Sequence, residues 1–373
     1  MASIWIAQLE PPYPNLPDPL VFSTGGPVRS VPTWETKRRG EVLELFRQHV
    51  YGRSPSSSRY ESRHRVVAES TTVDGKAKRK TVQVEVRGPK GTHRFNTFVY
   101  LPKKSSGPVP VFILINHRLG YSSLEEDSEF FPVLGTLIPR GYGAALLPAQ
   151  SVAPDLPEKF DSQLMSVFEE ANESSWKTIA VWAFGASRLV DYLVTDSEVD
   201  GARIGVIGHS RGGKTALWAA AEDTRIAFSV ANNSGCTGAA LARRKSGELV
   251  GEINRDFPHW FADAYDRFNG KDETLPVDQH QLIALVAPRP VYITAASQDP
   301  HSDPIGMFYA TVYAQPVYQL YNGLPKRWTV ADFPEPGAVM GNGPMTFHLR
   351  PGEHDLTRWD WERVLDAADR LMP

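Results

Sequence analysis

Apolar residues follow two patterns along this chain, and each pattern predicts a type of element. Continuous apolar runs at residues 109–115 and 143–147 are typical of strands that are buried on both faces of a parallel sheet. Apolar positions three or four residues apart, at 34–51 and 176–192, predict amphipathic helices. Further elements are expected as buried strands at 203–207, 228–231 and 290–296, a buried helix at 215–221 and a C-terminal helix at 361–371.

Apolar and polar residues alternate at 63–69, 77–87 and 92–101, which predicts antiparallel strands before the first buried run. Because strands and helices then alternate along the chain, we expect an α/β fold with a doubly wound, mainly parallel sheet in a three-layer sandwich. Residues 1–33 are rich in proline, and we expect them to form an irregular arm packed on the body. The sequence has no internal repeat or flexible linker, so residues 1–373 are predicted to form a single domain.

Composition and charge narrow the classes of partner. A net charge of −3 over 373 residues gives no basic footprint for nucleic acid and no polybasic patch for a membrane. No apolar run approaches the roughly 20 residues that a membrane-spanning helix needs. Cys236 is the single cysteine and there is no H-E-x-x-H pattern, so we expect no internal disulfide and no zinc site. We therefore expect no metal, no cofactor, no nucleic acid and no membrane partner.

A candidate nucleophile lies between the strand at 203–207 and the helix at 215–221. The residues Gly208-His209-Ser210-Arg211-Gly212 fit the G-x-S-x-G nucleophile elbow of α/β-hydrolases. A serine at such a sharp turn is held in strained backbone geometry, and glycines on either side keep the turn free of clashes. The following helix directs its first N–H groups at the same place, where an oxyanion would develop. The sequence therefore predicts an α/β-hydrolase fold with Ser210 as nucleophile.

A serine nucleophile needs a base, and the base needs an acid that orients it. In α/β-hydrolases the acid and then the histidine follow the serine along the chain. We prefer His354 as the base because it lies in a Pro-Gly loop before the last helix, whereas His348 lies in a predicted short strand. The acid is expected after the strand at 290–296, at Asp299 or, as the less favoured choice, at Asp303, whose Ser-Asp-Pro context also fits a helix cap.

Two cationic residues follow Ser210 closely. The backbone N–H of Arg211 is expected to form half of an oxyanion hole, with its guanidinium adding charge, and the second donor is expected from the loop at 116–120. Lys214 lies one helical turn from Ser210, so its ammonium group is expected to face the same cleft. Together these cations favour an acidic substrate.

The segment Ser210-Arg211-Gly212-Gly213-Lys214 matches the S-R-x-G-K core of the glucuronoyl esterases, carbohydrate esterase family 15, which this chain resembles from about residue 34 to its end. Several further segments resemble the bacterial branch of that family, at residues 233–241, 257–261, 275–280, 287–290 and 350–355. The resemblance implies cleavage of esters between 4-O-methyl-glucuronic acid on xylan and lignin alcohols, without a metal. It implies that Ser210 is the nucleophile, His354 the base and Arg211 an oxyanion stabiliser.

The resemblance also implies a sugar pocket made by Lys214, with Glu248 and Trp260 beside it. Many members carry a catalytic Glu where this chain has Asn233, and other bacterial members keep an Asp at the place of Asp299. Several of those have Trp two residues after that Asp, where this chain has His301. His301 is thus a candidate substrate-binding residue that would change how the sugar is held.

Two other functions remain open on the sequence. One is a broader carbohydrate or small-acyl (acetyl) esterase, favoured if His301 opens the pocket. The other is a weakly active carbohydrate-binding relic of a hydrolase, against which the presence of Ser210, Asp299 and His354 argues. We expect a secreted or periplasmic monomer that acts on carbohydrate, although no signal peptide is visible at the start of this chain.

Overall fold

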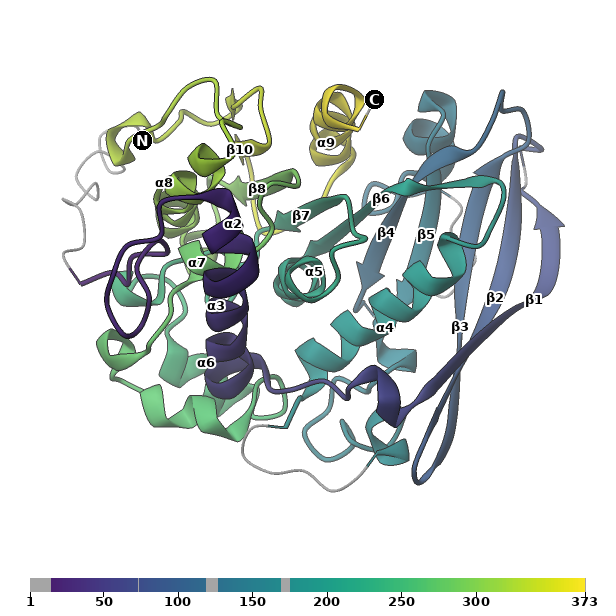
Figure 1. Cartoon of the computed structure of the whole chain (residues 1–373). Coiled ribbons are helices and arrows are strands. Elements are labelled where there is room, and N and C mark those ends of the chain that lie inside the picture. The colour runs from purple at the N-terminus through teal and green to yellow at the C-terminus, as the bar shows by residue number, and fades with distance from the viewer. Residues whose placement is uncertain (1–14, 73, 119–126, 169–174, 373) are drawn as a thin grey trace.

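The computed structural model of the chain describes residues 15–72, 74–118, 127–168 and 175–372. Its centre is a ten-stranded sheet in the order β1-β2-β3-β5-β4-β6-β7-β8-β10-β9 (Figure 1). The strands are β1 Glu61–Thr71, β2 Ala77–Gly88, β3 Gly91–Pro102, β4 Val109–Asn116, β5 Gly143–Pro148, β6 Val199–His209, β7 Phe228–Asn232, β8 Val291–Ala296, β9 Val339–Met340 and β10 Met345–Arg350.

Parallel pairing joins β5, β4, β6, β7, β8 and β10, and antiparallel strands extend this body at both edges. The parallel strands are the short apolar runs of the sequence, and every residue of β4 is buried. At the other end, β1 to β3 pair antiparallel and β2 alternates between buried and partly exposed positions. The sheet therefore matches the predicted mainly parallel α/β-hydrolase architecture.

Helices cover both faces of the sheet. The α-helices are α2 Val31–Thr33, α3 Arg39–Phe46, α4 Thr178–Leu193, α5 Arg211–Glu222, α6 Val250–Asp256, α7 Gln279–Ala284, α8 Pro304–Leu320 and α9 Arg358–Leu371. Shorter π or 3-10 turns are η1 Trp34–Arg38, η2 Arg47–Tyr51, η3 Ser57–Arg59, η4 Val133–Leu137, η5 Ile138–Arg140, η6 Ala149–Ser151, η7 Leu164–Val167, η8 Ala242–Arg244, η9 Asp263–Phe268, η10 Asp272–Thr274, η11 Pro300–Ser302 and η12 Val330–Asp332.

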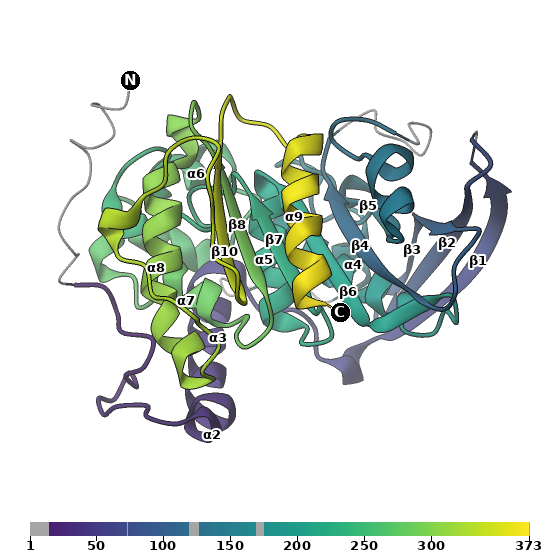
Figure 2. The same ribbon diagram turned by 90° about the horizontal axis from the view of Figure 1, so that it is seen from above.

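The two faces of β4 show how the core is divided. Ile113 packs into a cluster with Trp218 of α5, while Phe112 packs into a second cluster with Trp361 of α9. Figure 2 shows α9 on one face of the sheet and α5 on the other. Successive side chains of a strand point to opposite faces, so a continuously apolar strand must be covered on both sides. Because β6, β7, β8 and β10 are parallel neighbours, their carboxyl ends lie at one edge of the sheet.

The predicted elements are confirmed with small shifts in their ends. The helix at 34–51 is continuous with α2 and runs from η1 through α3 to η2, and the strand at 203–207 is the central part of the longer β6. The sequence did not predict α6, α7 or α8, and α8 contains Pro316 within its length. No helix among the described residues is long and apolar enough to cross a membrane.

The N-terminal arm can be followed only from residue 15 onward, because residues 1–14 lie outside the described part of the chain. Between residues 15 and 30 the backbone is irregular apart from the isolated bridge Val21–Pro27. Hydrogen bonds attach this part to the body: Arg38 Nε donates to the Pro19 carbonyl at 3.1 Å, and His280 Nε2 lies 2.8 Å from the Pro17 carbonyl. The assignment of residues 1–373 to one domain stays a prediction.

Candidate active site

Ser210 lies at the abrupt turn between β6 and α5. Its backbone has φ 55° and ψ −123°, and its N–H donates to the Asn232 carbonyl of β7 at 2.8 Å. A Cβ at Gly208 would lie 2.0 Å from the Gly212 carbonyl oxygen, so the strand and the helix can approach each other only with glycine there. The turn exposes Ser210 at the carboxyl edge of the sheet and directs the first N–H groups of α5 toward it.

His354 lies in the loop between β10 and α9, and that loop is braced from several directions. Arg350 Nη2 donates to the carbonyls of Glu353 and Asp355, at 2.6 and 3.0 Å. Asp355 in turn accepts from Arg118 Nη2 at 2.6 Å. A loop with its carbonyls and its carboxylate tied to fixed side chains holds the intervening imidazole in place.

Asp299, three residues after β8, is the carboxylate that His354 contacts. Its Oδ2 lies 2.5 Å from His354 Nδ1 and also accepts from Asn233 Nδ2 at 3.1 Å. Its Oδ1 accepts from the Ser302 N–H at 3.3 Å. Burial raises the pKa of Asp299, but the hydrogen bonds from His354 and Ser302 outweigh burial and hold that pKa below its usual value. The carboxylate is therefore charged near neutrality and fixes the Nδ1–H tautomer of His354.

Both alternatives to this pair have other contacts. Asp303 caps α8 by accepting from the Gly306 N–H at 3.1 Å, and it forms a buried ion pair with Arg244. His348 is fully buried in β10, with Nε2 2.8 Å from Asp360 Oδ1 and Nδ1 2.9 Å from the Tyr292 hydroxyl. The structure thus brings Asp299 and His354 together, whereas Asp303 and His348 contact other partners.

A pocket of about 200 Å³ opens beside Ser210 and His354. Most of the residues expected from the sequence to act on the substrate line it: Ser210, Arg211, Lys214, Glu248, Trp260, His301 and His354. Asn116, His117 and Arg118, from the loop expected to give a second oxyanion donor, are not among its lining residues, and residues 119 and 120 lie outside the described part of the chain.

Lys214 is buried at the base of this pocket. Its Nζ donates to the carbonyls of Ser234 at 2.8 Å and Cys236 at 2.5 Å, and it lies 3.8 Å from Glu248 Oε2. Burial lowers the pKa of Lys214, and the charge of Glu248 partly restores it. Two of the three ammonium protons are thus directed at backbone carbonyls, which leaves one for Glu248 or a ligand.

His301 lies at the rim of the pocket, with its side chain 73% exposed. Its Nε2 is 3.6 Å from Glu248 Oε1, and its carbonyl accepts from the Glu248 N–H at 2.9 Å. The pocket therefore has an exposed imidazole on one side and the Phe257–Trp260 stack on another, with those two ring centroids 3.8 Å apart.

Asp155 is a site residue that sequence reasoning missed. Its Oδ2 accepts from Arg211 Nη1 at 2.5 Å, and its Oδ1 accepts from Trp260 Nε1 at 2.7 Å and His259 Nε2 at 2.9 Å. Burial raises the pKa of Asp155, but the hydrogen bond from His259 and the charge of Arg211 outweigh burial and lower it to about 2. The available signal was weak: Asp155 follows β5, and the carboxyl edge of a parallel strand is where this fold places functional groups.

His209, immediately before Ser210, packs against the base. The ring centroids of His209 and His354 are 4.4 Å apart, and His209 Nδ1 lies 2.6 Å from Asn232 Oδ1. Asn232 Nδ2 donates to Thr294 Oγ1 at 2.6 Å, so its oxygen faces His209 and accepts the Nδ1 proton. Burial and the nearby His354 lower the pKa of His209 to about 3. His209 is therefore neutral, and its ring packs against the imidazole of His354.

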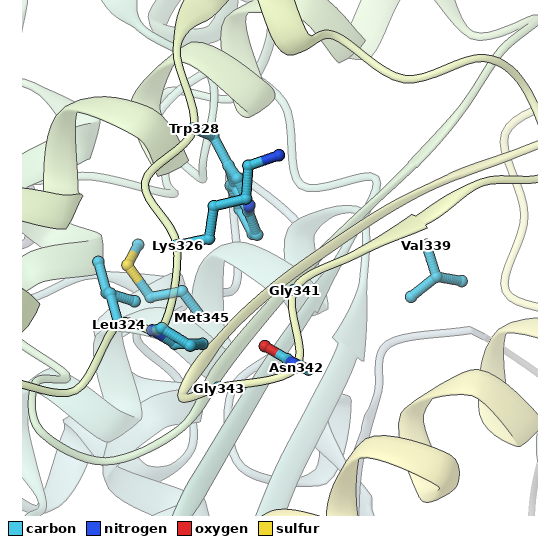
Figure 3. Close-up of a pocket in the computed structure, with 9 residues that line it drawn as sticks. Leu324, Lys326, Trp328, Val339, Gly341, Asn342, Gly343 and Met345 are labelled. Carbon is cyan, nitrogen blue, oxygen red and sulfur yellow. The ribbon is translucent and has the colours of Figure 1, made fainter.

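A larger hollow of about 470 Å³ lies near the start of β10, at the opposite end of the strand from the His354 loop. Figure 3 shows the residues that line it. Leu324, Trp328 and Met345 are among its lining residues, and Lys326 is the one ionisable group among the described residues that line it. None of its described lining residues is a nucleophile with a base beside it, so this hollow is not a candidate active site.

Comparisons with known proteins agree on one family. A family model described as glucuronyl esterase of fungi matches residues 82–322. The chain is 36% identical to a protein named carbohydrate esterase MZ0003, from an unknown prokaryotic organism, over 97% of this chain and 90% of that protein.

Two solved structures of bacterial origin are similar over nearly the whole chain. A promiscuous esterase of carbohydrate esterase family 15 from a marine bacterial metagenome has a TM-score of 0.85 at 35% identity, covering 98% of this chain and 99% of that one. A glucuronoyl esterase from Solibacter usitatus has a TM-score of 0.87 at 32% identity, covering 97% and 99%.

Proposed function

Because this chain belongs to the family of glucuronoyl esterases, we propose that it is a serine esterase that hydrolyses esters of glucuronic acid. The observation that carries the proposal is the juxtaposition, in one pocket, of the Ser210 elbow and the His354–Asp299 pair with Arg211 and Lys214. A nucleophile, an oriented base and fixed cations are the parts that acyl transfer through an oxyanion requires.

The reaction follows from these parts. His354 donates its Nδ1 proton to Asp299 as a hydrogen bond, so its Nε2 is free to take the proton of Ser210 as the hydroxyl oxygen attacks the ester carbonyl. The oxyanion is stabilised by N–H groups at the start of α5 and by the Arg211 guanidinium. His354 then gives its proton to the departing alcohol, which leaves an acyl ester on Ser210. A water molecule, activated by His354 in the same way, releases the uronic acid and restores Ser210.

The pocket also suits the sugar ring. Arg211 and Lys214 give its described lining two positive charges, against one negative charge on Glu248. Lys214 and Glu248 can hydrogen-bond sugar hydroxyls, and the edge of the Phe257–Trp260 stack offers apolar area. We therefore propose glucuronic acid, with or without a 4-O-methyl group, as the acyl half of the substrate.

The natural substrate is proposed to be a carbohydrate polymer, namely glucuronoxylan esterified to lignin alcohols. An enzyme that acts on such a polymer must meet it outside the cytoplasm, and we propose secretion or export to the periplasm on that ground. The protein named above as a promiscuous esterase belongs to this family, and the exposed His301 leaves one side of the pocket open. A broader carbohydrate or acetyl esterase is therefore the second candidate.

Hydrolysis of benzyl glucuronate, measured beside p-nitrophenyl acetate, tests the proposal. A glucuronoyl esterase should show the higher kcat/KM with benzyl glucuronate, because only that substrate uses the contacts of Lys214, Glu248 and Trp260. A preference for p-nitrophenyl acetate would favour the broader esterase. Little or no turnover of either substrate would indicate the weakly active relic.

A further inference from the structure

Asp155 joins parts of the chain that are far apart in sequence. It lies in the segment after β5 and η6, whereas Arg211 begins α5 and Trp260 follows α6. All three donors meet on its one carboxylate: Arg211 Nη1 on Oδ2, with Trp260 Nε1 and His259 Nε2 on Oδ1. The Asp155 side chain is only 6% exposed, so its charge is not free to serve solvent or a ligand.

The guanidinium of Arg211 is held on two sides. Its Cζ lies 4.5 Å from the ring centroid of Trp260, while Nη1 is bound to Asp155. A planar guanidinium fixed by a carboxylate and by an aromatic face has little rotational freedom left. Because Arg211 lines the pocket beside Ser210, this leaves its remaining N–H groups in a defined direction there.

We infer that Asp155 is a positioning residue: it acts through Arg211, by holding the guanidinium in the orientation that stabilises the oxyanion on the ester carbon. The inference rests on the proposed function of Ser210 and Arg211. The same carboxylate fixes the Trp260 indole through Oδ1. Asp155 therefore positions both Arg211, beside the reacting carbonyl, and Trp260, beside the sugar.

Two effects of Asp155 on Arg211 oppose each other. The negative charge reduces the positive field of Arg211, while the hydrogen bond fixes its direction. The Arg211 side chain is 28% exposed, so solvent screens the net charge, and a donor stabilises an oxyanion only when it is already aimed at it. We therefore expect orientation to dominate and removal of the Asp155 charge to slow the reaction.

The substitution Asp155→Asn distinguishes the contacts made by the two oxygens of the carboxylate. The amide oxygen can still accept from Trp260 and His259, which turns the NH2 group toward Arg211, where donor meets donor. The Arg211 contact is lost while the Trp260 contact is kept. The expected result is a fall in kcat of about tenfold or more with KM changed less than about threefold. Asp161→Asn, at an exposed carboxylate six residues away, is the matched control and should leave kcat unchanged.

A double-mutant cycle tests whether Asp155 acts through Arg211. In an Arg211→Met background, Asp155→Asn should change kcat less than about twofold, because the group that Asp155 holds is already gone. Losses that multiply in the double variant, or a kcat of Asp155→Asn that is unchanged or raised, would overturn the inference. The melting temperature of each variant is measured alongside.

Should Asp155→Asn fail to fold, Arg211→Lys gives an independent test. Lysine keeps the positive charge but has no planar fork with which to bind Asp155 and reach the carbonyl at once. Its kcat should fall nearly as far as that of Arg211→Met, and a kcat near that of the wild type would refute the positioning role.

Both substrates are used throughout. If the wild type turns over p-nitrophenyl acetate and not benzyl glucuronate, the proposed function fails. The cycle on p-nitrophenyl acetate, whose hydrolysis passes through the same oxyanion, then still decides the role of Asp155.

Discussion

Two aspartates four positions apart have different contacts, and those contacts favour Asp299 as the acid. Asp303 has φ 51° and points its carboxylate at the start of α8 and at Arg244, while Asp299 points at His354. From the sequence both follow the strand closely, and the Ser-Asp-Pro context of Asp303, which fits a helix cap, is what favours Asp299. We propose that Asp299 orients His354 and that Asp303 is structural.

Asp299→Asn should lower kcat/KM by roughly 10²–10⁴, because the amide neither balances the charge on His354 nor fixes its tautomer. Asp303→Asn should keep kcat/KM within about threefold of the wild type and instead lower the melting temperature, since breaking a buried ion pair costs about 3 kcal/mol. Steady-state kinetics and thermal unfolding of the two variants check this. A severe kinetic loss confined to Asp303→Asn would reverse the assignment.

The buried His209 should make the protein less stable as the pH falls. Its pKa is about 3 in the folded state, against about 6.5 for an unperturbed histidine. Below pH 6.5 His209 binds a proton in the unfolded chain but stays neutral in the folded chain until the pH approaches 3. The stability from this residue is therefore complete above pH 6.5 and is lost as the pH falls toward 3, at up to about 1.4 kcal/mol per pH unit.

Urea unfolding at pH 7 and pH 5 measures this effect. The free energy of unfolding should fall by about 2 kcal/mol less in His209→Gln than in the wild type over that interval, because glutamine does not titrate. Glutamine can still donate to Asn232. His301→Gln is the control: its side chain is exposed, so its pH dependence should match that of the wild type. An unchanged pH dependence in His209→Gln would show that His209 does not contribute.

At the scale of elements, the elbow depends on how closely β6 approaches α5. The approach is set by Gly208, where a Cβ would lie 2.0 Å from one backbone oxygen and 2.2 Å from a backbone carbon of Gly212. Backbone atoms cannot rotate away as a flexible side chain can, so the helix itself would have to move. The position of Ser210 relative to His354 therefore depends on the absence of a side chain at Gly208.

Gly208→Ala should destabilise the protein by several kcal/mol and abolish hydrolysis, because α5 must shift to admit the methyl group. Gly40→Ala is the matched control. Gly40 lies on the exposed side of α3, where an added methyl group would have nothing within 4 Å, and alanine there should stabilise by about 0.5–1 kcal/mol. Thermal unfolding and hydrolysis of benzyl glucuronate check both. Wild-type activity in Gly208→Ala would contradict the tight elbow.

At the scale of the whole molecule, the sequence predicts best those parts that are determined locally. Short continuous apolar runs mark strands that are covered on both faces, so β4, β5, β7 and β8 could be predicted from the order of apolar residues. Ser210 and His354 could be proposed as site residues because a short motif and a loop position point to them, and the structure places both beside one pocket.

Contacts between distant segments could not be found in the same way. Asp155 reaches Arg211 across 56 positions and Trp260 across 105, and no local pattern records such a meeting. The helix α8 could not be predicted because it contains Pro316 and is apolar on nearly all sides, so its sequence lacks the periodicity of an amphipathic helix. The contacts and the helix that the sequence does not predict are therefore determined by tertiary packing and not by local propensity.

We propose that Ser210 attacks the carbonyl carbon of a glucuronate ester. Hydrolysis of benzyl glucuronate by Ser210→Ala, compared with the wild type at matched melting temperature, tests it most directly. We expect the wild type to hydrolyse this ester and kcat/KM to fall on the order of 10³-fold or more in Ser210→Ala, because no acyl ester can form. Hydrolysis by Ser210→Ala at a rate near that of the wild type would contradict it.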